Sequence, residues 1–182
     1  MMLCCMERNE TAGSPAAYLL LEHMIWGAYS IALPEICKTP NGKPYFPARP
    51  DIHFSVSHSA SHVLCAVDGS PVGCDIESPR EVSRRVMDYA ASPEELEMLD
   101  FLDLWVLKES YIKLFGLTLA SAKKLSFSMA GGVASAPDPS VFCRVYRDIP
   151  GCPAAVCSMS GGLPGALGIV NPCDLHSFGV DK

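Results

Sequence analysis

The sequence of 182 residues lacks the spacings that mark a cysteine-based metal site. Its nine cysteines are scattered, and no Cys-x-x-Cys pair occurs to complete a zinc finger. Most of the cysteines fall within apolar stretches, where a reduced thiol behaves as a small core residue. We therefore expect free structural thiols and no zinc-binding module.

Long apolar runs are missing as well. No run reaches the roughly 18 residues that a bilayer-spanning helix needs, and residues 1–10 lack the basic region and apolar core of a secretory signal. No short repeat or low-complexity segment is present. These absences predict a cytoplasmic protein with no membrane partner.

Positive charge is scarce. Lysine and arginine number 14 against 20 aspartates and glutamates, so the net charge is −6, which argues against nucleic acid as the main partner. The basic residues that cluster are Arg80, Arg84 and Arg85, and the pair Lys123 and Lys124. Each cluster is either a solvated helix face or a docking surface for an acidic partner.

A length of 182 residues allows one well-buried domain or two small lobes that share a core.

The informative residues lie in two stretches. In the first, residues 72–77 with the sequence VGCDIE, apolar side chains alternate with small or acidic ones, which is the period of a strand with one buried face. Asp75 and Glu77 then project from one face, about 7 Å apart along the strand. Two carboxylates this close repel one another unless a cation lies between them or one of them is protonated.

The second stretch, residues 105–110 with the sequence WVLKES, is typical of a helix and supplies a third carboxylate, Glu109, flanked by Lys108 and Lys113. Three carboxylates suit a hard cation such as Mg²⁺, which keeps waters and takes further oxygens from a substrate phosphate. The lysines would hold the phosphates themselves.

A purely structural interpretation of the same residues stays open. Asp75 and Glu77 are also what the wet face of a half-buried sheet contains, and Glu109 with Lys113 is a favoured surface ion pair at i, i+4. However, Glu109 shares one side of its helix with large apolar residues, which predicts a partly buried carboxylate that needs a partner.

Periodicity and turn residues predict the remaining elements. Residues 1–14 carry no periodic signal and are expected to fray. Asp68 and Gly69 predict a hairpin turn that leads into residues 72–77, and Gly116 is a plausible helix C-cap. Helices are expected over 15–32, over 81–91, and from Ser92 to Gly116 with a possible new start at Asp100; strands are expected over 52–58, 63–67, 72–77, 125–129, 141–146 and 154–159.

Three motifs, in order, resemble the signatures of the 4′-phosphopantetheinyl transferases: residues 54–59 (FSVSHS), residues 72–77 (VGCDIE), and Trp105-x-x-Lys108-Glu109-Ser110-x-x-Lys113. The likeness is to the longer, pseudo-dimeric type that acts on carrier proteins of peptide and polyketide synthetases. It implies an α+β fold of two similar lobes, each with a small, mainly antiparallel sheet and a packed helix. We expect the lobes to be residues 1–71 and residues 72–182.

The resemblance also implies an activity: Mg²⁺-dependent transfer of the phosphopantetheine arm of coenzyme A to a serine of an acyl or peptidyl carrier protein, with release of adenosine 3′,5′-bisphosphate. Residue by residue, Asp75, Glu77 and Glu109 resemble the metal ligands, and Asp75 and Glu109 the catalytic carboxylates, Glu109 being the general base. The residues expected to contact coenzyme A are Lys43, His58, Lys108 and Lys113, with Lys108 left open between a phosphate contact and surface packing.

The sequence departs from the family pattern in three places. The half before the first motif is short, the segment from Glu77 to Trp105 is compressed, and a glycine pair after the lysine motif is reduced to Gly116. Two other functions are therefore kept: a non-catalytic member that binds coenzyme A or a carrier protein, and an unrelated Mg²⁺ phosphohydrolase. The short first lobe also raises the hypothesis of self-association through exposed apolar surface.

Overall fold

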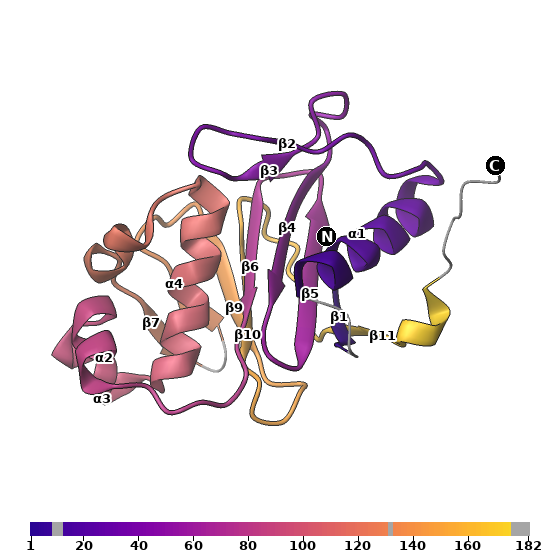
Figure 1. Cartoon of the computed structure of the whole chain (residues 1–182). Coiled ribbons are helices and arrows are strands. Elements are labelled where there is room, and N and C mark those ends of the chain that lie inside the picture. The colour runs from indigo at the N-terminus through magenta and orange to yellow at the C-terminus, as the bar shows by residue number, and fades with distance from the viewer. Residues whose placement is uncertain (9–12, 131–132, 176–182) are drawn as a thin grey trace.

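The computed structural model describes residues 1–8, 13–130 and 133–175, and over these residues the chain is a mixed α+β structure (Figure 1). Two sheets stand side by side in the middle of the molecule, with a long helix on each flank (Figure 1). A small two-stranded sheet lies across one end. The expected α+β class is confirmed.

The first sheet is packed against helix α1 (Gly13–Tyr29). Its strands run in the order β11-β1-β5-β4, antiparallel except for the parallel pair β11 and β1. Leu20, Leu21 and Ile25 of α1 are fully buried against this sheet. The strands are β1 (Met2–Glu7), β4 (His53–His58), β5 (His62–Asp68) and β11 (Gly168–Val170).

The second sheet is packed against helix α4 (Phe101–Phe115). Its strands follow the order β6-β10-β9-β8-β7, and all the pairs are antiparallel. The strands are β6 (Val72–Ile76), β7 (Ser128–Ala130), β8 (Val133–Ser135), β9 (Phe142–Tyr146) and β10 (Ala154–Ser158). Two short helices, α2 (Arg84–Ala90) and α3 (Pro93–Met98), and the 3-10 turn η1 (Leu119–Lys124) complete this half.

The two sheets meet where β4 lies beside β6. Leu64 and Ala66 of the first sheet share one apolar cluster with Val72, Cys74 and Ile76 of the second. The backbone N–H of Cys74 donates to the Ser55 hydroxyl at 3.0 Å, so a side chain of β4 pairs with the backbone of β6 here. The hairpin expected at Asp68 and Gly69 is therefore wrong, since β5 and β6 are consecutive but belong to different sheets.

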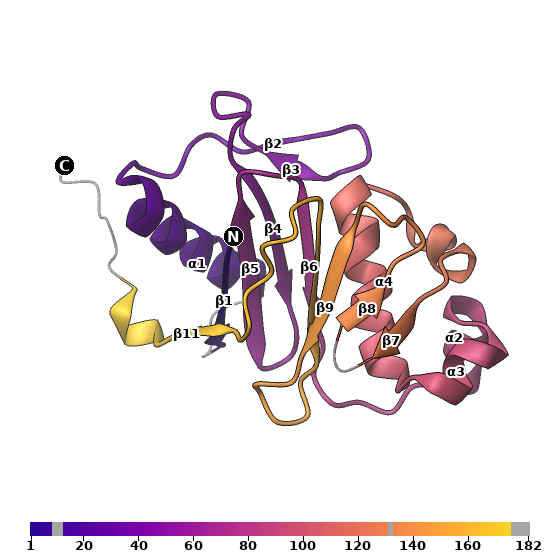
Figure 2. The ribbon, with the colours of Figure 1, turned by 180° about the vertical axis from the view of Figure 1, so that it is seen from behind.

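Two further segments tie the halves together. The strands β2 (Cys37–Lys38) and β3 (Pro44–Tyr45) form a hairpin that reaches across the ends of both sheets (Figure 1). After β10 the chain crosses the back of the sheets to reach β11, and then forms the 3-10 turn η2 (Pro172–Asp174) (Figure 2).

The signals at the helix ends perform as expected. Ser92 and Glu95 form a reciprocal capping box with Pro93 in the first turn of α3, and the Asp100 side chain caps α4 at the N–H of Leu102. Gly116 ends α4 in the left-handed conformation at φ 64°.

Five strands of the described residues lie outside those expected from the sequence: β1, β2, β3, β8 and β11. β1 lies in the stretch expected to fray, and β8 lies in a segment expected to be a loop. β1 carries apolar residues on both faces because it is covered on both: Leu3 and Cys5 join the cluster between the sheets, whereas Met6 packs with α1. A strand covered on both faces has no alternation to detect.

The nine cysteines, all within the described residues, are free. No helix in the described ranges has the length and apolarity to cross a membrane.

Candidate active site

Gly73 brings α4 close to β6. A Cβ atom at this position would lie 2.1 Å from the Ser110 carbonyl oxygen and 2.4 Å from the Leu114 backbone nitrogen. Only a residue without a side chain leaves room for that approach. Gly73 alternates with the buried Cys74, so the neighbouring Asp75 also faces the helix, beside the turn that carries Glu109 and Lys113.

Asp75 is the centre of a buried polar network. Its Oδ1 accepts hydrogen bonds from the Lys113 ammonium and from the Ser57 hydroxyl, each at 2.6 Å, and Lys113 also donates to Ser57 at 3.0 Å. Burial by itself lowers the pKa of Lys113, but the charge of Asp75 and its neighbours outweighs burial, so the pKa is raised. Lys113 therefore stays charged and neutralises Asp75.

Glu109 has no such neutralising partner. Within the described part of the chain it makes no hydrogen bond or ion pair, although it is half-buried. Burial raises the pKa of the Glu109 carboxyl, and the charges of Asp75 and Glu77 raise it further against the opposing effect of Lys113. The carboxylates are thus close enough to act on one another electrostatically.

Glu77 lies just past the end of β6 and is held by Arg80. The guanidinium of Arg80 donates to both carboxylate oxygens at 3.3 Å, with the two side chains 43% and 22% exposed. This is a solvated pair of the kind that contributes little to stability. Glu77 is therefore free to exchange Arg80 for another cation at small cost.

These side chains line one cavity of about 350 Å³ between α1, β4, β6 and α4. His58, at the exposed end of β4, forms part of the opposite wall, and its Nε2 lies 3.3 Å from the Ser14 hydroxyl of α1. The cavity is lined by Ser14, Ala17, Tyr18, Val56, Ser57, His58, Asp75, Glu77, Trp105, Glu109 and Lys113.

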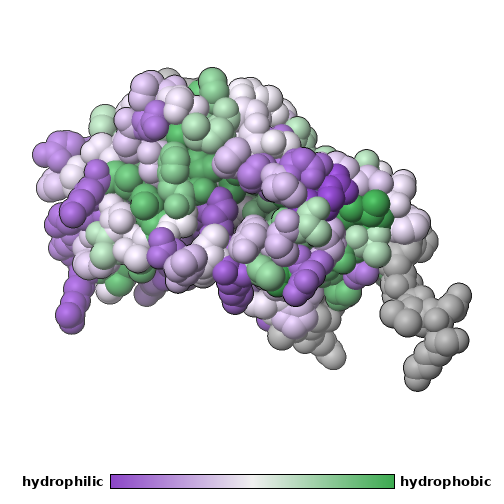
Figure 3. Space-filling model, turned by 90° about the horizontal axis from the view of Figure 1, so that it is seen from above, coloured by the Kyte–Doolittle hydropathy of each residue, from purple (hydrophilic) through white to green (hydrophobic). Residues whose placement is uncertain are grey.

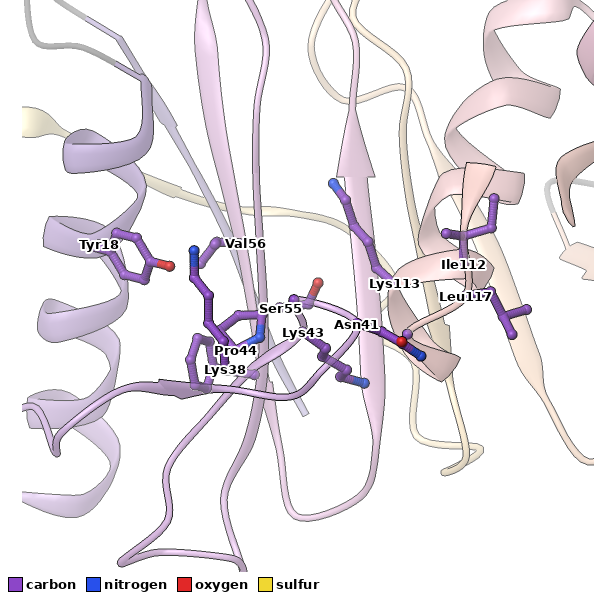
Figure 4. A pocket seen from close by; sticks show the side chains of 13 residues that line it. Tyr18, Lys38, Asn41, Lys43, Pro44, Ser55, Val56, Ile112, Lys113 and Leu117 are labelled. Atoms are coloured by element: carbon purple, nitrogen blue, oxygen red, sulfur yellow. The ribbon is translucent and has the colours of Figure 1, made fainter. Parts of the chain in front are cut away.

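A second cavity of about 260 Å³ adjoins the first, because both are lined by Tyr18, Val56 and Lys113. Figure 4 shows its walls: Tyr18 and Lys38 lie on one side, and Ile112 and Leu117 of α4 and its C-terminal end lie on the other. Phe115, Leu117 and Leu119 are exposed at that end of α4, on the half of the molecule where Figure 3 shows a broad apolar surface.

The sequence resembles known phosphopantetheinyl transferases. Residues 71–147 match a family model described as the 4′-phosphopantetheinyl transferase superfamily. The chain is 34% identical to the 4′-phosphopantetheinyl transferase Sfp of Bacillus subtilis (strain 168), over 71% of this chain and 65% of the relative. It is also 34% identical to the 4′-phosphopantetheinyl transferase ffp of Bacillus subtilis, over 68% of this chain and 62% of the relative.

The chain belongs to the 4′-phosphopantetheinyl transferase superfamily. A further relative, a 4′-phosphopantetheinyl transferase of Bacillus subtilis, is 40% identical over 43% of this chain and 40% of the relative. The matched part of the chain thus spans 40%, 65% and 62% of the length of these three transferases.

Within this member of the superfamily, the structure brings most of the expected site residues together. Asp75, Glu77, Glu109, His58 and Lys113 line the first cavity. His58 comes from the first motif, Asp75 and Glu77 come from the second, and Glu109 and Lys113 come from the third, although 51 positions separate His58 from Glu109 in the sequence.

Lys43 lines the adjoining cavity, but its ammonium is directed to the protein. It donates to the carbonyl of Leu114 in the last turn of α4, and more weakly to the Val72 carbonyl at 3.5 Å. Burial lowers the pKa of Lys43. A lysine that bonds the free carbonyls at a helix C-terminus also interacts favourably with the helix dipole, so Lys43 fastens the β2–β3 hairpin to α4.

Lys108 lies outside both cavities. Its side chain is 1% exposed, and the ammonium donates to Glu95 at 2.7 Å and to the Ala90 carbonyl at 2.8 Å. The two alternatives from the sequence, a phosphate contact or a surface lysine, both differ from this interior position. Neighbouring helical residues point about 100° apart, and for that reason Glu109 faces the cavity while Lys108 does not.

Among the lining residues that were not selected as site residues from the sequence are Ser57, Tyr18 and Trp105. The signal for Ser57 was present, because strand alternation put it on one face with Ser55 and next to His58. Tyr18 carried no signal, since only the packing of α1 beside β4 places it at the cavity.

The donor set suits Mg²⁺ in kind, since three carboxylates with hard oxygen atoms line the same cavity and the half-buried Glu109 is unpaired there. In the described ranges, however, no three His, Cys, Asp or Glu side chains converge closely enough to hold a metal ion. Asp75 forms an ion pair with Lys113, and Glu77 forms one with Arg80.

Proposed function

We propose that the chain transfers the 4′-phosphopantetheine arm of coenzyme A to a serine of an acyl or peptidyl carrier protein. The observation that carries this proposal is the single cavity lined by Asp75, Glu77 and Glu109 together with two groups suited to phosphate, His58 and Lys113. Attack on a pyrophosphate requires carboxylates that can hold a cation, beside groups that can bind the phosphate oxygens.

Asp75, Glu77 and Glu109 are the residues proposed to hold Mg²⁺. When bound, the ion would neutralise charge on the pyrophosphate oxygens of coenzyme A. Glu77 is available once Arg80 leaves it, and Asp75 offers Oδ2 beside the oxygen that Lys113 and Ser57 occupy. Lys113 is then directed to both the carboxylate and the substrate phosphate.

Glu109 is the proposed general base. Burial and the neighbouring carboxylates raise the pKa of Glu109, which makes it a stronger proton acceptor than an ordinary glutamate. The serine oxygen would attack the phosphorus attached to the pantetheine arm as Glu109 takes the hydroxyl proton. The bond from that phosphorus to the bridging oxygen breaks, and adenosine 3′,5′-bisphosphate leaves with the oxygen.

The adjoining cavity is the proposed place of the nucleotide. It opens from the phosphate-binding groups at Lys113 and offers aromatic and apolar walls, with Lys38 and Asn41 as polar groups (Figure 4). Lys43 would contact coenzyme A only from this side, and in the present structure it is bonded to the backbone of α4.

We further propose that the two halves of the fold are the similar lobes of a pseudo-dimeric transferase, divided between residues 71 and 72, that acts in the cytoplasm. Each half has a sheet and one long helix, α1 or α4. The division is not complete along the chain, because β11 returns to pair with β1.

A turnover assay tests the proposal. The purified chain, coenzyme A and an apo-carrier domain are combined with and without Mg²⁺, and the mass of the carrier is followed. We expect a Mg²⁺-dependent gain of one phosphopantetheine on the carrier serine. As a control, a known transferase must modify the same carrier in the same buffer. If the carrier mass then stays unchanged with the wild-type chain, the proposal is contradicted.

A second function, binding of coenzyme A or a carrier without turnover, is favoured by one observation. Lys113 and Arg80 pair with Asp75 and Glu77, and no three acidic, histidine or cysteine side chains of the described residues converge on a metal position. Binding of coenzyme A by calorimetry without carrier modification would support this function. Release of inorganic phosphate in the absence of a carrier would instead indicate a phosphohydrolase.

A further inference from the structure

Lys108 and Glu95 form the most deeply buried ion pair in the part of the chain that the structure describes. Their side chains are 1% and 4% exposed, and the two charged atoms are 2.7 Å apart. Neither residue lines the cavities of the proposed site. The pair therefore needs an explanation other than substrate contact.

The pair connects four segments of the second half. Lys108 donates to the carbonyl of Ala90 at the end of α2 and to Glu95 in the first turn of α3. Glu95 accepts in turn from the backbone N–H of Ser92 and from that of Phe127, which precedes β7, each at 3.0 Å. Every one of these contacts is a directional, charge-assisted hydrogen bond.

The opposite side of α4 is fixed by a second polar contact. The Ser110 hydroxyl shares its one proton between the Val106 carbonyl of its own helix at 2.6 Å and the Ala155 carbonyl of β10 at 3.0 Å, next to the close approach of the helix to Gly73. Two positions along a helix correspond to about 200° of rotation, so Lys108 and Ser110 hold α4 from nearly opposite sides. Glu109, which lies between them in the sequence, is thereby directed to the third side.

Stability alone does not account for the pair. Taking two charges out of water costs several kcal/mol per ion, and well-packed apolar residues in place of a buried ion pair are often as stable or more so. Apolar contacts would tolerate small rotations and shifts of α4, whereas the directional hydrogen bonds of Lys108 and Glu95 do not. A misplacement of about 1 Å at a catalytic group costs on the order of 10²-fold in rate.

We propose that Lys108 and Glu95 are positioning residues, which fix the rotation of α4 so that Glu109 and Lys113 meet Asp75 in the cavity. This inference rests on the proposed transferase function for the role of Glu109. It assigns to the lysine of the third motif a task away from the phosphates, carried out through the helix.

The test uses a neutral variant of similar side-chain volume. Lys108→Met combined with Glu95→Gln removes both charges, and the single amide oxygen of Gln accepts from only one of the two backbone N–H groups, of Ser92 and Phe127, that Glu95 binds with separate oxygens. We expect a folded protein whose kcat for carrier modification falls about 10²-fold, with the KM for coenzyme A within about threefold of wild type. The Mg²⁺ concentration for half-maximal activity should rise, because Glu109 is displaced from its partners.

A matched control breaks another ion pair of the same helix. Arg147→Met removes the partner of Asp103, which lies in the first turn of α4 and is itself buried. We expect this variant to lose stability without a change in kcat. A folded double variant with wild-type kcat, or an equal loss of kcat in Arg147→Met, would overturn the positioning role, as would failure of the double variant to fold.

A readout independent of turnover separates this inference from the transferase proposal. Trp105 on α4 lines the cavity, and the chain has only two tryptophans, so in a Trp26→Phe background its fluorescence reports the position of that face. Acrylamide quenching of Trp105 should increase in the double variant and stay unchanged in Arg147→Met. If wild type does not modify a carrier, the transferase function fails while this measurement still decides the positioning role.

Discussion

The two long helices are held in place by different physics. α1 buries Ala16, Ala17, Leu20 and other apolar side chains, and a single polar contact at its first turn, from Ser14 to His58, reaches the cavity. α4 buries Asp103, Lys108 and Ser110 as well as its apolar residues. The helix that supplies Glu109 and Lys113 is thus the one with directional contacts on several sides, as the proposed catalytic role of Glu109 requires.

The largest effect should come from removing a carboxylate that α4 and β6 bring together. Asp75→Ala or Glu109→Ala should lower carrier modification by at least about 10²-fold, the scale for loss of one positioned catalytic group. Carrier mass as a function of time measures it. Glu97→Ala, which removes an exposed carboxylate of α3, is the control, and activity near wild type in the Asp75 variant would refute the site.

Glycine-to-alanine substitutions at Gly73 in β6 and at Gly27 in α1 should change the free energy of unfolding in opposite directions. At Gly73 a methyl group meets the Ser110 carbonyl, and overpacking of this kind costs about 1–3 kcal/mol. At Gly27 in α1 nothing lies within 4 Å, so Gly27→Ala should stabilise by about 0.4–1 kcal/mol. Urea unfolding of both variants measures the difference. Equal effects would show that α4 does not depend on its close approach to β6.

Glu109 should cost stability at neutral pH. Its folded pKa is raised above the ordinary value of 4.5, so the folded state holds the proton more tightly than the unfolded state. The stabilising effect of that proton is complete below about pH 4.5 and is lost as pH rises through the folded pKa. Glu109→Gln should therefore unfold at a higher temperature than wild type at pH 7.

The gain in unfolding temperature should shrink as pH falls toward 4.5, the ordinary value for glutamate. Scanning calorimetry at several pH values gives the comparison, with Glu97→Gln as the exposed control. A Glu109→Gln variant that is less stable than wild type at pH 7 would mean that the carboxylate has a stabilising partner.

The smallest effect is expected at Arg80. Its pair with Glu77 is solvated, so Arg80→Gln should leave the unfolding temperature nearly unchanged. Because Glu77 is then unpaired, the Mg²⁺ concentration for half-maximal activity should fall by a few-fold. A rise would indicate that Arg80 assists the site. Arg84→Gln, which breaks the exposed pair with Asp88, is the matched control.

Local patterns predicted the side of an element on which a residue lies, but they did not predict burial: every residue of β6 is buried, so the expected strand with one buried face was wrong. The alternation in residues 72–77 put Asp75 on the face opposite Cys74, and the capping signals at Ser92 and Gly116 set the ends of the helical region. They failed where covering depends on distant segments. β1 is buried on both faces, and β5 and β6 follow a turn sequence yet join different sheets.

The lysines show the limit most clearly. Three lysines lie in motif-like stretches, but their partners differ. Lys43 donates to a carbonyl at the end of α4, Lys108 pairs with the buried Glu95, and Lys113 pairs with Asp75 in the cavity. A long flexible side chain can reach several partners from one backbone position. Its partner is chosen by what the fold places within reach.

By itself, the sequence determined the helix ends, the alternating strand and the three motifs that mark the superfamily, because these depend on residues close together along the chain. Only the tertiary structure decided which charges face the cavity and which are buried behind it. Burial and the approach of β6 to α4 at Gly73 depend on segments about 40 residues apart, and no local pattern encodes that distance.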